Sequence, residues 1–413
     1  MPVGLKPRTV SPSTPERDIL VSDVPRAILG RPVYLDCAAT TPIDPRVQAI
    51  VLQYLSAEFG NAGSRTHEYG LHARRAVEKA RDQVARVVGA KRGEVIFTSG
   101  ATESNNLALL GLANHGLSAG KRHIVSTRIE HHAVLEPLQA LADEGFTVSL
   151  LAPNGHGWVE PEAVREALRD DTLLVSVMHV NNETGVVQPL SEIASVLTGH
   201  AAYFHVDAAQ GFGKDIETLR HPRIDLISVS GHKIHAPKGI GALIARRRKG
   251  SLPPLKPLMY GGGQERGLRP GTLPVHLAAG LGKAAELGLA EAKQRHEQAE
   301  AFRLQLLRGL KPLAPVLNGD PSRCVPHILN ISIPGFDAET VMEAWKDLAA
   351  VSDGAACTSQ SYTCSHVLSA MGIPEERKDG AVRLSWCHLT ELPDVKSMVK
   401  ALERFRMRAE PVK

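Results

Sequence analysis

Residues 225–241 read DLISVSGHKIHAPKGIG, a short apolar run followed by a lysine in sequence rich in glycine and proline. The apolar run is typical of a buried strand. Lys233 therefore follows the end of that strand, in irregular backbone. Open α/β folds bind ligands at the carboxyl ends of their strands, and a desolvated lysine there can form a Schiff base. An exposed loop lysine has the same local sequence, so this interpretation depends on the rest of the chain.

Strands and helices alternate on both sides of this stretch, which predicts an α/β fold. The pattern predicts a mostly parallel sheet with helices covering both of its faces. The predicted strands of this sheet span residues 94–98, 123–126, 147–151, 173–180, 203–206, 226–229 and 241–245. The predicted helices span residues 44–55, 68–88, 161–168 and 190–197, with two more beginning near residues 101 and 132. A further short strand is expected at 33–36.

The chain is predicted to form a large and a small domain. Residues 1–31 are rich in proline, serine and threonine, and are expected to form an extended or partly disordered arm. Residues 32–290 form the large domain, and a long helix over 275–310 leads into a smaller α+β domain, 291–413, on which the N-terminal segment could pack. The predicted elements of the small domain are strands at 328–333, 350–352 and 382–385, and helices at 339–348 and 393–408.

Composition excludes several classes of protein. Lys and Arg number 48 against 44 Asp and Glu, and aromatic residues make up 4% of the chain, so no direct nucleic-acid binding is expected. No apolar run is long enough to span a membrane. The five cysteines contain no C-x-x-C pair and indicate neither a disulfide framework nor a metal site. These features predict a soluble, cytoplasmic protein.

Polar residues at other strand ends supply partners for Lys233 in a pyridoxal 5′-phosphate (PLP) site. Asp207 ends a strand and could hold a pyridinium nitrogen protonated, although a helix N-cap is the alternative. Thr102 begins a helix after a glycine turn, where free N–H groups can bind a phosphate. His131 could stack on the ring and move protons, or lie on the surface. Asn182 and Gln210 could bond the phenolic oxygen of the ring.

Cys357 differs from the other cysteines because small residues surround it. A mobile, exposed loop suits a nucleophilic thiol, whereas a structural cysteine usually lies among apolar residues. Cys364 is interpreted as a helix-start residue, with a second thiol of the same region as the alternative. Cys37, Cys324 and Cys387 are interpreted as small core or near-site residues.

Taken together, these motifs resemble the cysteine desulfurases of the NifS/IscS type, which are fold-type I PLP enzymes of the class V aminotransferase family. The similarity runs in the order of the family from about residue 33 to about residue 400. The stretches that carry it are 34–42, TSGATES at 98–104, Glu130-His131, HVNNE at 179–183, HVD at 205–207, SGHK at 230–233, RPGT at 269–272 and ACTS at 356–359.

The resemblance implies a role for each matched residue. Lys233 forms the Schiff base, His131 stacks on the ring as acid and base, Asp207 pairs with the pyridine nitrogen, and Gln210 bonds the phenolate. The phosphate is held by Ala101, Thr102, Ser230 and His232, and by Thr272 from the second subunit of a homodimer. The carboxylate of the substrate, L-cysteine, is held by Asn182 and Arg383. The Cys357 thiolate takes the substrate sulfur as a persulfide, alanine is released, and the sulfur passes to a protein acceptor.

The sequence departs from the family in places that bear on the surroundings of the substrate carboxylate and on the acceptor. Residues 384–388 read LSWCH where the family commonly reads Ser-Leu-Gly-Arg, and Pro270 stands where many members have serine. The tail after Arg383 is short for docking an iron–sulfur scaffold. The sequence around Cys357 and the loop 60–64 is more similar to desulfurases that supply DNA phosphorothioation.

The sulfur acceptor therefore stays open between iron–sulfur assembly, tRNA thiolation and DNA phosphorothioation. Two other readings of the chain also stay open. One is a lyase acting on selenocysteine or cysteine sulfinate, and the other is a non-catalytic sulfur-relay scaffold.

Overall fold

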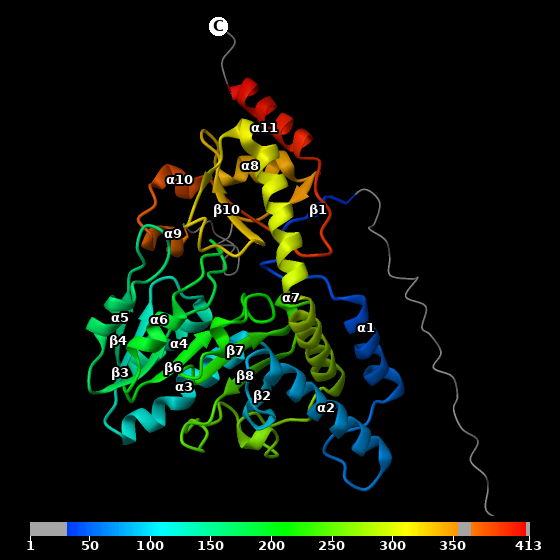
Figure 1. Ribbon diagram of the computed structural model, residues 1–413, viewed down its shortest axis with the longest axis vertical. Coiled ribbons are helices and arrows are strands. Elements are labelled where there is room, and N and C mark those ends of the chain that lie inside the picture. The colour runs from blue at the N-terminus through cyan, green and yellow to red at the C-terminus, as the bar shows by residue number, and fades with distance from the viewer. Residues whose placement is uncertain (1–30, 354–364, 410–413) are drawn as a thin grey trace, which may run out of the picture.

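The computed structural model describes residues 31–353 and 365–409, and a seven-stranded sheet forms its centre (Figure 1). The strand order is β2-β8-β7-β6-β5-β3-β4. Strand β8 pairs antiparallel with both neighbours, while the other pairs are parallel. This confirms the predicted mostly parallel sheet. Its strands are β2 (Val95–Thr98), β3 (His123–Thr127), β4 (Thr147–Leu151), β5 (Thr172–Ser176), β6 (Tyr203–Asp207), β7 (Leu226–Ser230) and β8 (Gly241–Ala245).

Helices cover both faces of this sheet because successive strand residues point to opposite sides. Ile96 packs with apolar residues of α3 and α4, while its neighbour Phe97 packs with those of α2, α5, α6 and α7. The helices of this part are α1 (Pro45–Leu52), α2 (Glu68–Val87), α3 (Ala101–Ser118), α4 (His132–Asp143), α5 (Pro161–Ala167), α6 (Leu190–Val196) and α7 (Val275–Leu310).

A second, smaller core lies at the far end of α7, which runs from the large sheet into it (Figure 1). Its three-stranded antiparallel sheet has the order β12-β10-β9. A separate parallel pair joins β1 near the start of the described chain to β11, so these distant segments lie side by side. The elements are β1 (Val33–Tyr34), β9 (Val316–Leu317), β10 (Ile328–Ser332), β11 (Ala349–Ala350), β12 (Ala381–Ser385), α8 (Ala338–Trp345), α9 (His366–Ala370), α10 (Glu375–Asp379) and α11 (Val395–Ala409). The exact domain boundaries stay predictions.

Several predicted boundaries were wrong by a few residues. Strand 173–180 ends at Ser176, because the chain then leaves the sheet and Val180 bridges to Val187 instead. Helix 44–55 begins as predicted, with the Asp44 carboxylate accepting from the Arg46 N–H at 2.9 Å, but α1 ends at Leu52 and continues as a π-helical turn. Within the described ranges, no helix is long and apolar enough to cross a membrane.

Candidate active site

A cavity of about 490 Å³ opens at the carboxyl ends of β6 and β7. It brings together side chains from distant parts of the sequence, including the small-domain strand β12. The residues predicted from sequence that line it are Ala101, Thr102, His131, Asn182, Asp207, Gln210, Ser230, His232, Lys233 and Arg383. Their convergence on one cavity is what the predicted roles require.

Lys233 reaches this cavity through a tight turn after β7. The strand ends at Ser230, and residues 231–233 form one 3-10 turn. A Cβ atom at Gly231 would lie 2.8 Å from the carbonyl oxygen of Ile240, so the turn needs glycine. The Lys233 ammonium donates to the carbonyl oxygens of Ala38 and Ala39, the latter at 2.9 Å. The segment after β1 therefore holds the amine at the cavity wall.

Asp207 is a buried carboxylate at the end of β6. Its Oδ2 accepts from the Asn105 side-chain amide at 2.8 Å, and its Oδ1 accepts from the Ala209 N–H at 2.9 Å. Both donors are neutral. Neither donor carries a charge that would pair with the carboxylate, so Asp207 is available to a cationic ligand group in the cavity.

The N-terminus of α3 supplies an anion site in the same cavity. The first turn of a helix has backbone N–H groups without intrahelical partners, and the helix dipole favours negative charge there. Ala101 and Thr102 begin this turn, after Gly100 as N-cap. Strand β8 lies directly against the turn, because a Cβ atom at Gly241 would lie 2.6 Å from the Gly100 Cα. With Ser230 and His232 on the same wall, this arrangement suits a phosphate.

His131 caps α4 and faces the cavity. Its Nδ1 accepts from the Ala133 N–H at 3.0 Å, so the neutral ring carries its proton on Nε2. Burial lowers the pKa of His131, which keeps the ring neutral near pH 7.

The residue before it, Glu130, was not predicted as a site residue. It is fully buried, and burial raises its pKa to about 8. Its Oε1 accepts from the Thr127 hydroxyl at 2.7 Å and from the Met178 N–H at 2.9 Å. Glu130 therefore ties the start of α4 to the segment after β5 and positions His131.

Arg383 joins the small domain to the cavity. Its guanidinium donates to Asp36 Oδ1 at 2.7 Å and to the Asn182 carbonyl oxygen at 2.9 Å. The Nε atom is buried without a partner in the part of the chain that the structure describes. Asn182 and Arg383, both predicted to hold the substrate carboxylate, are therefore neighbours. Asp36 was missed as a site residue because only the fold reveals its pairing with a residue 347 positions away.

The remaining predicted residues have different outcomes. Gln210 donates to the Ala38 carbonyl oxygen at 2.8 Å, while its Oε1 is buried with no partner among the described residues. Thr272 lies outside this cavity, in a pocket shared with residues 61–64 and Arg266. Cys357 and Cys364 lie outside the described residues.

Comparison with known proteins places the chain in a family. Residues 33–398 match the family Aminotransferase class-V. The chain belongs to this family. Among curated proteins it is similar to cysteine desulfurase IscS of Vibrio cholerae serotype O1 (strain ATCC 39541), with 45% identity over 87% of this chain and 89% of the relative. It is 46% identical to cysteine desulfurase IscS of Salmonella arizonae, over 86% of this chain and 87% of the relative. The chain is thus a cysteine desulfurase, a PLP-dependent class V aminotransferase.

Solved structures agree with this assignment. The crystal structure of DndA from Streptomyces lividans has 53% identity and a TM-score of 0.75, covering 86% of this chain and 99% of that one. A NifS-like protein has 34% identity and a TM-score of 0.82, covering 91% and 100%. Both similarities extend across most of this desulfurase.

The cavity of this cysteine desulfurase fits PLP. The α3 N-terminus suits the phosphate, the Asp207 carboxylate suits the pyridinium nitrogen, and the Lys233 amine suits the aldehyde carbon. Two amide oxygens, Gln210 Oε1 and Asn105 Oδ1, are buried without partners among the described residues. Buried polar atoms are normally paired, so such atoms on a cavity wall indicate a polar ligand.

Proposed function

We propose that this desulfurase takes sulfur from L-cysteine onto Cys357 and passes it to a protein acceptor. The convergence of ten predicted residues on one cavity supports this assignment most directly. In it, Lys233 would hold PLP through its amine, and Asp207 would keep the ring nitrogen protonated. The phosphate would be held by Ala101, Thr102, Ser230 and His232, with Gln210 at the phenolic oxygen.

PLP, when bound, supplies an electrophilic carbonyl carbon and an electron sink for the substrate. Lys233 and His131 would move the protons, since each offers a nitrogen on the cavity wall. Arg383 and Asn182 would orient the substrate carboxylate, for which the planar guanidinium is suited. The Nε of Arg383, buried and without a partner among the residues that the structure describes, is a donor available for that carboxylate.

Cys357 would perform the step that distinguishes a desulfurase. Its thiolate attacks the substrate sulfur, an S–S bond forms, and the C–S bond breaks. The carbon framework takes up a proton and leaves as alanine. An acceptor thiol or a reductant then removes the outer sulfur and restores the Cys357 thiol.

The acceptor is proposed to belong to a DNA phosphorothioation system. The similarity around Cys357 and residues 60–64 to desulfurases of that kind supports this proposal. We further propose a cytoplasmic homodimer, in which Thr272 reaches the phosphate in the partner subunit. The free thiols of Cys37, Cys324 and Cys387 fit a reducing compartment.

The test is alanine formation from L-cysteine by the PLP-loaded enzyme and three variants. Cys357→Ser should lose at least about 100-fold in turnover yet retain the visible absorption of bound PLP, as expected for loss of a nucleophile. Lys233→Ala should lose both. Cys324→Ser, a cysteine outside the site, is the matched control and should match the wild type.

Three outcomes would count against the proposal. Full turnover by Cys357→Ser would exclude the persulfide step. Rates on selenocysteine or cysteine sulfinate that are equal in Cys357→Ser and the wild type would favour a lyase. Absence of PLP absorption in the wild type after PLP is added would favour a scaffold. Enzyme loaded with labelled cysteine and mixed with cell lysate should label one acceptor, with Cys357→Ser as the unlabelled control.

A further inference from the structure

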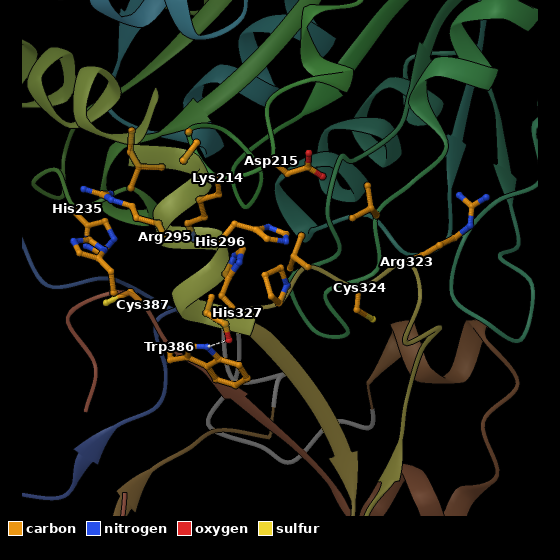
Figure 2. Close-up of a pocket in the computed structure, with 18 of the residues that line it drawn as sticks. Lys214, Asp215, His235, Arg295, His296, Arg323, Cys324, His327, Trp386 and Cys387 are labelled. Atoms are coloured by element: carbon orange, nitrogen blue, oxygen red, sulfur yellow. Dashed lines mark hydrogen bonds between the residues drawn. The ribbon is translucent and has the colours of Figure 1, made fainter. Parts of the chain in front are cut away.

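A second cavity, of about 370 Å³, lies between α7 and the segment that follows β12 (Figure 2). Its wall includes Lys214, Arg295 and His327, none of which has a role in the chemistry above. Figure 2 shows His235 and Cys387 at one end of this cavity, and Cys324 and Arg323 at the other. The LSWCH departure from the family thus places three of its residues, Trp386, Cys387 and His388, on the wall of a cavity.

Three potential metal ligands meet at the first end. One ligand atom each from His235, Cys387 and His388 lies within 4.8 Å of the other two. His235 is buried, and the other two are partly buried. The sequence could not reveal this group, because His235 comes from the lysine turn of the large domain while the other two follow β12.

His235 is held in the tautomer that a metal ligand needs. Its Nδ1 lies 3.0 Å from the Pro42 carbonyl oxygen, which only accepts, so Nδ1 must donate. The lone pair is therefore on Nε2. A histidine that ligates a metal usually donates its other N–H to such a carbonyl. The backbone has φ of +70°, an uncommon value for a residue other than glycine, and the Thr41 hydroxyl fixes it by accepting from the His235 N–H at 2.9 Å.

A side-chain hydroxyl lies beside the Cys387 sulfur. The Thr390 Oγ1 lies 3.5 Å from the Cys387 Sγ. The same Thr390 hydroxyl lies 3.9 Å from the Cys37 Sγ, so a second, buried thiol adjoins this position. A thiolate is the form of cysteine that binds metals.

His388 provides a ring nitrogen with no assigned use. Its Nε2 is buried and makes no hydrogen bond within the described ranges. The Asp44 Oδ2 lies 3.8 Å away, beyond hydrogen-bond distance. The rings of His235 and His388 pack edge to face with their centroids 4.7 Å apart. An unpaired buried nitrogen is costly, and a ligand would relieve that cost.

We propose that His235, Cys387 and His388 form a Zn²⁺ site whose fourth position opens to the second cavity. In tetrahedral Zn²⁺ sites with one sulfur and two nitrogen ligands, the ligand atoms lie about 3.3–3.6 Å apart. Side-chain rotations that shorten the separations by about 1 Å would suffice. One thiolate with two imidazoles is a borderline ligand set that suits zinc, and the site lacks the all-oxygen ligands that magnesium or calcium prefers.

The charges around the site permit a dication. Arg295 and Arg46 lie nearby, but both pair with Asp44 and Glu291, at 2.5–3.6 Å, so these four charges offset one another. Burial lowers the pKa of Lys214 to about 8, so that ammonium loses its proton at modest cost. The Cys387 thiolate then supplies a negative charge at the ion itself.

The ion would fasten two parts of the enzyme together. His235 follows Lys233 by two residues, and Cys387 follows Arg383 by four. A Zn²⁺ ion bound to both would therefore fix the turn that carries Lys233 relative to the strand that carries Arg383. This role is one of positioning, since none of the three ligands lines the first cavity.

Metal binding to untagged, PLP-loaded protein tests the proposal. The background protein for every measurement carries both Cys357→Ala and Cys364→Ala, because these changes remove two other thiols that could bind metal. After Zn²⁺ loading and gel filtration, one Zn²⁺ per chain is expected. In that background Cys387→Ser should weaken binding by more than about 100-fold, because loss of even an outer partner of a ligand costs 10–100-fold. His388→Gln should weaken it as well, and Cys324→Ser, at the other end of the cavity, should not.

Co²⁺ supplies a second readout that does not depend on turnover. Co²⁺ bound in place of Zn²⁺ should give intense visible d–d bands of a four-coordinate ion, at wavelengths longer than the PLP absorption, and Cys387→Ser should abolish them. The proposal is overturned if Zn²⁺ and Co²⁺ bind equally well to the background protein and to its Cys387→Ser and His388→Gln variants. It is also overturned if the background protein retains no metal after gel filtration. Either result would leave the desulfurase assignment unaffected.

Discussion

His205 lies in the interior of β6, with Nδ1 2.8 Å from the Ser176 Oγ and Nε2 3.0 Å from the Ser228 Oγ. Burial lowers its pKa to about 4. The folded protein therefore keeps this ring neutral at pH values where the unfolded chain, with an ordinary pKa near 6.5, takes up a proton. Because the unfolded state binds more protons, the free energy of unfolding must fall as pH drops from about 6.5 to about 4, by about 3 kcal/mol for this residue.

The measurement is urea unfolding of wild type and His205→Gln at pH of about 7.5 and about 5. The variant should lose less stability between the two values, because it has no proton to take up at this position. Other, partly buried histidines with lowered pKa values, such as His232 and His388, should leave a residual slope in both proteins. An identical pH dependence in the two proteins would show that His205 does not titrate differently on folding.

At the same scale, sequence patterns identified the residues that line the cavity more completely than the residues that hold them in position. Lys233, Asp207 and Thr102 follow strands or begin a helix, and strand-end position is visible in the sequence. Glu130 and Asp36 lie inside recognisable motifs, but their roles depend on Met178 and Arg383, which only folding brings near. Burial and long-range pairing are not local properties, so sequence patterns could not assign those roles.

At the scale of elements, the close approach of β8 to the first turn of α3 controls the phosphate site. A Cβ atom at Gly241 would lie 2.4 Å from the Val229 carbonyl oxygen and 2.6 Å from the Gly100 Cα, both backbone atoms. Gly241→Ala must therefore push β8 away from this turn. We expect a loss of stability of about 1–3 kcal/mol, as for other overpacked sites, and weaker PLP binding.

Thermal unfolding and PLP titration of the apoenzyme measure these two effects. Gly155→Ala is the matched control, since its Cβ atom would meet nothing closer than the Met371 carbonyl oxygen at 3.9 Å. The control should bind PLP like the wild type. Wild-type PLP affinity in Gly241→Ala would mean that the α3 turn does not hold the phosphate.

The direction of β8 shows what element patterns leave out. Its apolar run predicted a strand, and the structure confirms the strand at the predicted residues. The run carries no information about direction, however, and β8 pairs antiparallel with β2 and β7. The short elements β9 and α10 were not predicted at all, since two and five residues are too few to show a period.

At the scale of the whole molecule, we group three exposed aromatic residues with Thr272 as one candidate face. Phe59, Tyr69 and Tyr260 are 69%, 59% and 88% exposed, and the rings of Phe59 and Tyr69 lie 5.7 Å apart. Residues 61–64, which lie between Phe59 and Tyr69 in the sequence, line a pocket together with Thr272 and other residues of its loop. Exposed aromatic residues near a polar loop are typical of a protein interface. This face is therefore our candidate for the dimer contact.

Phe59→Asp combined with Tyr260→Asp should shift the proposed dimer toward monomer, because each change places a charge in the apolar centre of the contact. Light scattering after gel filtration measures the mass. Leu304→Asp, at a side chain 55% exposed on α7, is the control and should leave the mass unchanged.

Thr272→Ala should retain the dimer but bind PLP about tenfold more weakly, the cost of one hydrogen bond to a charged group. A dimer that survives the double change would move the contact elsewhere on the surface, and wild-type PLP affinity in Thr272→Ala would remove that residue from the phosphate site of the partner.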